Sequence, residues 1–190
     1  MATLLEVVAE EARTCTRCGL ASGRTQVVFG RGDPDADLMF IGEGPGAEED
    51  RLGEPFVGRS GQLLDRLVHE ELGLARDDVR VVNVVMCRPP GNRDPLPEEI
   101  EACSPYLSRQ IELTAPRVIV TLGNFATRFV LQTKEGITKL RGRTHSHPSG
   151  ATVVPTFHPA AVLRGGAESM AQMRADLVRA KLLLREGVPR

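Results

Sequence analysis

Four cysteines are the residues whose spacing most directly predicts a site in this chain. Cys15 and Cys18 form a C-x2-C pair, and Cys87 and Cys103 follow much later, with 15 residues between them. We favour a four-thiolate metal site over buried free thiols or disulfides, because a cytoplasmic chain seldom forms disulfides. Spacing alone fits zinc and an iron–sulfur cluster equally: the second pair is no zinc knuckle, whereas a cluster tolerates dispersed ligands.

Asn83 is a polar side chain inside an otherwise apolar stretch, VVNVVMC at residues 81–87. Burying its amide without hydrogen-bond partners would cost about 1–3 kcal/mol. Either a ligand uses this amide, or it satisfies neighbouring backbone groups. Asn83 is therefore a candidate for reading a ligand, with a cysteine a few residues later at the end of the same stretch.

The elements that must position these residues are four apolar stretches alternating with helical patterns. Stretches that are apolar on both faces are typical of parallel strands covered by helices. The strands are predicted at 37–42, 79–87, 116–123 and 151–157, and the helices at 60–73, 95–113, 124–132 and 167–186. Pro105 should kink the second helix or divide it in two. We expect one domain over residues 1–190, a three-layer α/β/α fold with a four-stranded parallel sheet.

Each predicted strand runs into a polar or glycine-rich segment. These segments are GEGPGAEED, CRPPGNRD, the dipeptide Gly-Asn and HPAAVLRGG. In such folds, ligands bind beyond the carboxyl ends of the strands, and the four ends converge on one edge of the sheet. The sequence therefore predicts a site at this edge.

Composition and charge narrow the class of protein. The net charge of −1 hides an asymmetry: residues 1–116 hold 12 Lys and Arg against 21 Asp and Glu, and residues 117–190 hold 12 against 4. A polyanion could dock on the second half, unless folding interleaves the two halves. No run is long and apolar enough to span a bilayer, and the acidic start does not read as a signal peptide, so we expect a cytoplasmic protein.

Three motifs and the four cysteines carry a family resemblance. GEGPGAEEDRLGEPFVGRSGQLLD (42–65), NVVMCRPPGNRDP (83–95) and HPAAVLR (158–164) resemble the family 4 uracil-DNA glycosylases over nearly the whole chain. The resemblance implies the uracil glycosylase superfamily fold and a [4Fe-4S] cluster bound by Cys15, Cys18, Cys87 and Cys103. Family 5 enzymes lack an acid at the position of Glu43. A covalently trapping relative carries an inserted KRRIH stretch, where this chain reads RPPGNRDP.

The resemblance also implies how a flipped uracil is read. The amide of Asn83 would donate to uracil O4 and accept from N3–H, a pattern that cytosine reverses. Phe56 would stack beneath the base, with about 1–3 kcal/mol of stacking expected per base. His158 would donate, as a neutral imidazole, to uracil O2 as negative charge develops there.

Glu43 and Asn92 are the candidates for activating or orienting the attacking water. The best-known uracil glycosylases carry an aspartate where this chain has Gly44, so their catalytic carboxylate does not transfer by alignment. The backbone amides of Gly44 and Gly46 are expected near uracil O2, since glycine permits close approach. For the side chain that rejects thymine, Glu49 is the candidate.

DNA contacts are expected from two segments. AVLRGG (161–166) resembles a loop that enters the minor groove, with Leu163 as a wedge and Arg164 as a phosphate ligand. The stretch KLRGRTHSH would contact phosphates if it is extended, or form a solvated hairpin; its alternate residues are Lys139, Arg141, Arg143, His145 and His147.

The expected function is that of a monomeric, monofunctional uracil-DNA glycosylase, a base-excision-repair hydrolase that leaves an abasic site. No lysine at the motif positions could form a Schiff base. One alternative is a glycosylase for a broader set of deaminated bases. The other is a non-catalytic iron–sulfur protein, an electron carrier or a DNA-binding module, although the cysteines are not clustered as in ferredoxins.

Overall fold

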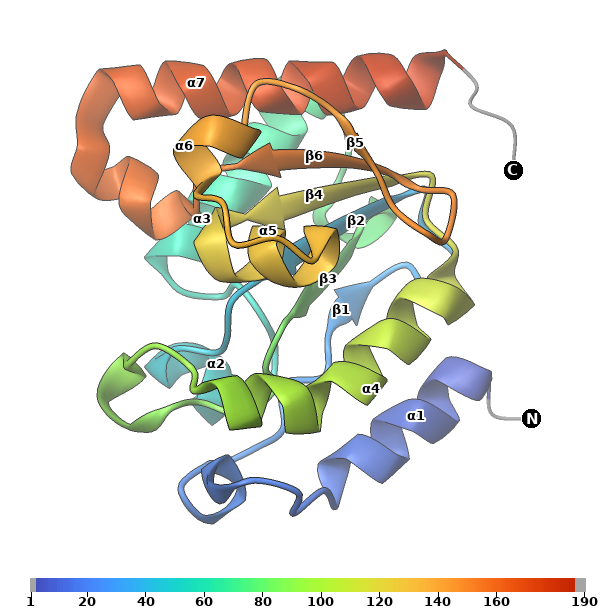
Figure 1. The fold of residues 1–190 in the computed structure, drawn as a ribbon, viewed down its shortest axis with the longest axis vertical. Helices are drawn as coiled ribbons and strands as arrows, with labels where there is room; N and C mark the ends of the chain where they lie inside the picture. Colours follow the sequence, from blue (N-terminus) through green and yellow to red (C-terminus); the bar gives the residue numbers. More distant parts are fainter. Residues whose placement is uncertain (1–2, 187–190) are drawn as a thin grey trace.

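A six-stranded sheet runs through the middle of the protein in this computed structural model, which describes residues 3–186 (Figure 1). The strands are β1 (Arg31–Gly32), β2 (Leu38–Gly42), β3 (Arg80–Asn83), β4 (Val118–Leu122), β5 (His145–Ser146) and β6 (Thr152–Thr156). Their order is β1-β3-β2-β4-β6-β5, in which the four inner strands are parallel and both edge strands antiparallel. The predicted parallel sheet is confirmed, with two short edge strands added.

Helices cover both faces of the sheet. The α-helices are α1 (Leu4–Arg13), α2 (Ala47–Leu52), α3 (Arg59–Leu67), α4 (Pro97–Thr114), α5 (Gly123–Leu131), α6 (Ile137–Leu140) and α7 (Pro159–Arg185). Short helical turns are η1 (Gly19–Ser22), η2 (Val68–Leu72), η3 (Arg76–Asp78) and η4 (Pro90–Asn92). Helices α3 and α7 pack on one face and α4 and α5 on the other, while α1 lies along α4 (Figure 1).

Alternation along the central strand explains the apolar stretches. Leu38 and Phe40 of β2 point into the core beneath α3 and α7, whereas Met39 and Ile41 point into the core beneath α4 and α5. All five residues of β2 are buried, because a helix layer covers each face. The apolar pattern of the sequence is therefore the pattern of a two-sided core.

The second predicted strand is shorter than expected. It ends at Asn83 rather than at Cys87, because the chain bends there. The next residues still pair with the segment after β2: the Val84 N–H donates to the Gly42 carbonyl at 2.9 Å, and the Val85 N–H to the Glu43 carbonyl at 3.0 Å. Asn83 thus stands at the end of its strand, on the edge where ligands bind.

Two segments differ from the sequence predictions. Helix α4 continues through Pro105 as one element, so of the two predicted outcomes, a kink or a division, the division is wrong. The segment AVLRGG is not a loop: it forms the first turns of α7, and Gly166 (φ 75°, ψ −157°) bends this element before its long second part. Figure 1 shows the bend between the two parts of α7.

The order of the inner strands defines where a ligand fits. From β2 the chain goes to β3 on one side. The connection after β3 then crosses to β4 on the other side of β2, so the direction of the strand order reverses at β2. Such a reversal opens a crevice at the carboxyl ends of the strands. Gly42, Asn83, Gly123 and His158 all lie at or just beyond these ends.

Candidate active site

A cavity of about 460 Å³ lies at the carboxyl ends of the parallel strands. Its walls include nine residues predicted from the sequence, namely Glu43, Gly44, Gly46, Glu49, Phe56, Asn83, Asn92, His158 and Arg164. Leu163 does not line the cavity; its side chain is 45% exposed on α7, beside Arg164. Ser60, Arg93 and Asp94 also line the cavity and were not singled out as site residues.

The amide of Asn83 has the property expected of a group that binds a ligand. The residue is only 1% exposed, and its Oδ1 has no hydrogen-bond partner in the described part of the chain. Gly42, its neighbour across the sheet, makes the room: a Cβ there would lie 2.4 Å from this Oδ1 and 2.6 Å from the Phe56 ring. Sequence reasoning missed Gly42, although it is the first glycine of GEGPG.

Phe56 adopts a backbone conformation that L-residues rarely adopt. Its φ is 55°, and holding a non-glycine residue there costs about 1–3 kcal/mol. Its ring lies 5.8 Å from the His158 ring between centroids, with 33° between the ring planes. The surrounding structure must therefore stabilise this backbone conformation, which brings Phe56 to the wall of the cavity.

His158 begins α7 and caps it. Its Nδ1 accepts the Ala160 N–H at 3.1 Å, so in the neutral ring the proton sits on Nε2, which is then a donor. Burial lowers the pKa of His158 to about 4; the positive charge of Arg164 adds to this effect, and Glu49 opposes it. The imidazole is therefore a neutral hydrogen-bond donor at physiological pH.

Glu43 is a carboxyl group poised to exchange a proton. Burial, with a smaller contribution from the negative charge of Asp94, raises the pKa of Glu43 to about 7. Both residues line the cavity. A carboxyl with a pKa near the working pH is suited to accept a proton from water.

The orientation of Asn92 is set by an arginine that the sequence did not single out. Arg88 Nε donates to Asn92 Oδ1 at 2.7 Å, so the amide nitrogen of Asn92 is the side that remains to donate. Asn92 has a φ of 56°, in the left-handed region that asparagine tolerates better than most residues. Its place on the wall makes it suited to orient a water or a substrate oxygen.

The Glu49 carboxylate is engaged by backbone groups. It accepts the N–H of Gly46 at 3.1 Å, of Val57 at 3.1 Å and of Gly58 at 3.0 Å. These bonds join the loop after β2 to the segment that carries Phe56. Glu49 lines the cavity, but its carboxylate accepts these backbone N–H groups and so connects two segments of the cavity wall.

The four cysteines gather where the N-terminal segment meets α4. Cys18, Cys87 and Cys103 pack in one apolar cluster, and Cys15 joins Cys103 in the adjoining one. Burial is the main cause that raises the pKa of Cys87, and of Cys103 to about 12; the other thiols add to both shifts. Arg24 approaches this group, with its guanidinium 3.5 Å from the Cys87 sulfur.

The four thiols together are a soft donor set. Thiolates are ligands of both zinc ions and iron–sulfur clusters. A soft four-thiolate set, with an arginine beside it to offset negative charge, fits an iron–sulfur cluster.

The basic stretch after α5 is extended over only part of its length. Residues 137–140 form α6, and the side chain of Arg141 turns inward: its Nε lies 3.1 Å from Asp176 Oδ2, and its guanidinium 5.1 Å from the Phe157 ring centroid. Asp176 is completely buried, so Arg141 serves the packing of α7. His145 and Ser146 form β5, which pairs antiparallel with β6 as a hairpin, and contact of this stretch with phosphates stays a prediction.

Folding interleaves the acidic and basic halves of the chain. Arg174 of α7 pairs with Glu70 and Glu71, and Arg117 lies 3.6 Å from Asp37. Each of these pairs joins a cation of the second half to an acid of the first. The charge asymmetry of the sequence is thus partly neutralised inside the fold.

The amino-acid sequence is similar to those of known proteins. Residues 29–180 match the family model of the uracil DNA glycosylase superfamily. A type-4 uracil-DNA glycosylase of Thermotoga maritima is 45% identical over 185 residues, which cover 96% of each chain. One of Sulfurisphaera tokodaii is 48% identical over 166 residues, 84% of this chain and 76% of its own. A type-5 enzyme of Thermus thermophilus is 34% identical over 149 residues, 69% of this chain and 68% of its own.

In the described part of the chain, no helix combines the length and apolarity needed to span a membrane.

Proposed function

The chain belongs to the type-4 uracil-DNA glycosylases of the uracil DNA glycosylase superfamily, and from this premise we propose how it excises uracil from DNA. The enzyme is a hydrolase of N-glycosyl bonds that acts in DNA repair. Its substrate must leave the base stack, because the glycosidic bond is out of reach inside a duplex. The cavity at the carboxyl ends of the strands receives the flipped base.

One observation carries the assignment of the base-binding residue: Asn83 Oδ1 is buried and has no partner in residues 3–186. An Asn amide offers an acceptor and donors side by side. Oδ1 accepts N3–H of uracil and Nδ2 donates to O4. Cytosine presents an acceptor at N3 and a donor at C4, so it would leave this buried amide facing groups of its own kind.

Phe56 and His158 hold the base from its face and its edge. The Phe56 ring stacks on the flipped uracil, an interaction supported by its place at the cavity wall. As the N1–C1′ bond breaks, its electron pair passes to uracil and negative charge grows on O2. The Nε2–H of His158 donates to this oxygen, and the backbone amide of Gly44 adds its dipole, whereas the Gly46 N–H is already bonded to Glu49.

Glu43 activates the attacking water and Asn92 orients it. The water oxygen attacks C1′ on the side opposite to the leaving base, and its proton passes to the Glu43 carboxylate. The ionised carboxylate also stabilises the positive charge that builds on the sugar before attack. Asn92, with its oxygen held by Arg88, donates from its nitrogen to fix the position of the water.

DNA binds across the mouth of the cavity. The exposed Leu163 fills the gap that the flipped nucleotide leaves, and Arg164, at the cavity wall, contacts a phosphate. Both residues are presented by the rigid first turns of α7. The described residues that line the cavity include no lysine that could form a Schiff base, in keeping with a monofunctional enzyme that leaves an abasic site.

Cys15, Cys18, Cys87 and Cys103 would hold a [4Fe-4S] cluster. Its role is structural: four iron–thiolate bonds tie the N-terminal segment to the end of β3 and to α4. Because Cys87 lies four residues after Asn83, fixing Cys87 also fixes the strand end that reads the base.

The test is release of free base from oligonucleotides containing uracil, hypoxanthine or thymine, in single- and double-stranded form. We expect free uracil and an alkali-labile abasic site, with no strand cleavage before alkali. Comparable release of hypoxanthine would instead mean that the cavity reads deaminated bases in general. No release of any base would refute the proposed activity.

A further inference from the structure

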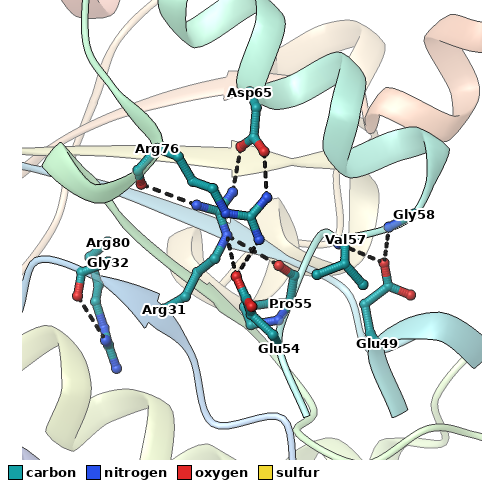
Figure 2. Close-up of polar contacts among 10 residues, drawn as sticks. All are labelled: Arg31, Gly32, Glu49, Glu54, Pro55, Val57, Gly58, Asp65, Arg76 and Arg80. Atoms are coloured by element: carbon teal, nitrogen blue, oxygen red, sulfur yellow. Dashed lines mark hydrogen bonds and ion pairs between the residues drawn. The ribbon is translucent and has the colours of Figure 1, made fainter. Parts of the chain in front are cut away.

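The segment that carries Phe56, residues 54–58, belongs to no helix or strand. It must nevertheless keep Phe56 at a φ of 55°. One restraint is steric: a Cβ on Gly61 would lie 1.8 Å from the Phe56 carbonyl oxygen, so α3 packs directly on this backbone. The other restraints come from side chains distant in sequence, and Figure 2 shows them on both sides of the segment.

Arg31 holds the segment from the side of the edge strand. It lies on β1, is only 7% exposed, and its Nε donates to the Pro55 carbonyl at 3.2 Å. Its other nitrogens donate to the Arg76 carbonyl and to Asp65 of α3. The guanidinium thus joins three separate parts of the chain (Figure 2).

Arg76 completes this side of the arrangement. It pairs with Asp65 and with Glu54, the residue before Pro55. Two arginines and two carboxylates therefore surround the start of the segment, and their charges balance. A neutral, mutually bonded set of ions keeps its geometry better than a single exposed pair.

Glu49 holds the segment from the other side. Its Oε1 accepts the N–H groups of Val57 and Gly58, which directly follow Phe56, while its Oε2 accepts the Gly46 N–H of the loop after β2. Arg31 therefore fixes the carbonyl before Phe56 and Glu49 fixes the amides after it (Figure 2). None of these hydrogen bonds involves the Phe56 ring itself.

We propose that Arg31 and Glu49 are positioning residues for uracil excision, which act by clamping residues 55–58 so that the Phe56 ring is already in its stacking position before DNA binds. This inference rests on the proposed stacking role of Phe56. A preformed platform spares the enzyme the cost of ordering the segment on binding. A small displacement of a positioning group is enough to slow catalysis by up to about a hundredfold.

The competing explanation is that Arg31 only stabilises the edge strand, and the chain provides a matched control for it. Arg80 lies on β3 in register with Gly32, is 5% exposed, and donates to Gln110 and to the Gly32 carbonyl. It is buried like Arg31 and borders the same edge strand, but it makes no bond to residues 54–58 (Figure 2). Lysine at either position keeps the charge and loses the planar set of donors.

The experiment compares Arg31→Lys, Glu49→Gln and Arg80→Lys in the intact protein, each alone and combined with Phe56→Leu. Single-turnover release of uracil reports on catalysis, thermal unfolding on stability, and residue-resolved amide exchange of Val57 and Gly58 on the clamp itself. We expect Arg31→Lys and Glu49→Gln to slow excision about tenfold or more and to speed exchange of these amides. Arg80→Lys should change neither, even where it lowers thermal stability as much.

The combinations with Phe56→Leu decide between the two explanations. If the clamp acts through the ring, Arg31→Lys should slow the Phe56→Leu enzyme by less than about twofold, the usual limit of additivity. Effects that multiply in the double variant, or unchanged exchange at Val57 and Gly58, would overturn the proposal. A parent protein that releases no uracil would refute the proposed function instead, and the exchange measurement alone would then decide whether the clamp exists.

Discussion

At the scale of single residues, the polar groups of the site lack their usual hydrogen-bond partners or have unusual ones. His158 spends its Nδ1 on the Ala160 N–H and keeps Nε2–H for the cavity. Asn83 Oδ1 has no partner among residues 3–186, and the half-buried Glu43 feels the negative charge of Asp94. Each departure from the usual rule has a matching step in the proposed mechanism of uracil excision.

His158→Ala should slow bond cleavage by about 10²–10³-fold and leave DNA affinity nearly unchanged, because its hydrogen bond strengthens only as charge grows on uracil O2. Single-turnover excision and equilibrium binding to uncleavable DNA measure the two quantities. An equal loss of affinity with an unchanged cleavage step would assign His158 to phosphate binding or to capping of α7 alone.

Excision should rise with pH through about 7 and then level off. The raised pKa of Glu43 means that its carboxyl is mostly protonated below about 7 and ionised above it, and only the ionised form accepts a proton from water. His158 does not add a second limb there, since the pKa of its imidazole is lowered to about 4. Glu43→Gln should lower the rate and abolish this limb in a single-turnover pH profile. A limb that survives in Glu43→Gln belongs to another group.

Asn83→Asp should lose most uracil excision and gain weak excision of cytosine. A protonated Asp offers one donor and one acceptor, which suit cytosine N3 and its amino group, while an ionised Asp repels uracil O4. Burial favours the protonated acid, so the gain should be larger at acidic pH. The measurement is release of free cytosine and free uracil across pH. Unchanged release of uracil would show that Asn83 does not read the base edge.

At the scale of elements, strand ends and loops place these groups within reach of one another. Gly42 ends β2 opposite Asn83, and its missing side chain leaves space that the Asn83 amide and the Phe56 ring occupy. Glu49 then joins the loop after β2 to the segment that carries Phe56. The site depends as much on what is absent at Gly42 as on the groups that remain.

Gly42→Ala should reduce excision by about tenfold or more, because a Cβ so close to Asn83 and Phe56 must displace one of them. Gly136→Ala is the matched control: its φ is −85°, and the nearest atom to a new Cβ lies 3.8 Å away. Excision by each variant should be compared with its thermal stability. Normal excision by Gly42→Ala would mean that the Asn83 amide and the Phe56 ring need not hold their present positions.

The elements also show how far sequence reasoning reaches. Four parallel strands and the polar groups at their ends could be predicted, because apolar runs and strand-end motifs are local features. The end of β3 at Asn83 and the helical form of AVLRGG could not, since the pairing of β3 with β2 and the bend at Gly166 are settled by the whole fold. The clamp around Phe56 was invisible for the same reason: Arg31 and Pro55 lie 24 residues apart.

At the scale of the whole molecule, two separate devices tie the chain together. Ion pairs such as Arg174 with Glu70 join α7 to the first half of the chain. The four thiols bring together the segment after α1, the segment after β3 and α4. With the proposed cluster bound to these thiols, the stability of the protein would depend on iron.

The purified protein should be brown, with broad absorbance at about 400 nm from charge transfer between thiolate and iron. Cys87→Ser should bleach this absorbance and lower both thermal stability and excision, because Cys87 follows the strand end that carries Asn83. Iron and sulfide analysis of the same preparation measures cluster content. A colourless, zinc-loaded and fully active protein would contradict the cluster.

The position of the cysteines along the chain also orders events during synthesis. All four lie within the first 103 residues, whereas β4, β6 and His158 come after residue 117. A ribosome therefore completes all four cysteines while β2 still lacks its neighbour β4 and His158 has yet to be translated. For the proposed cluster, every ligand is thus available in the nascent chain before the sheet and the proposed active site can be completed.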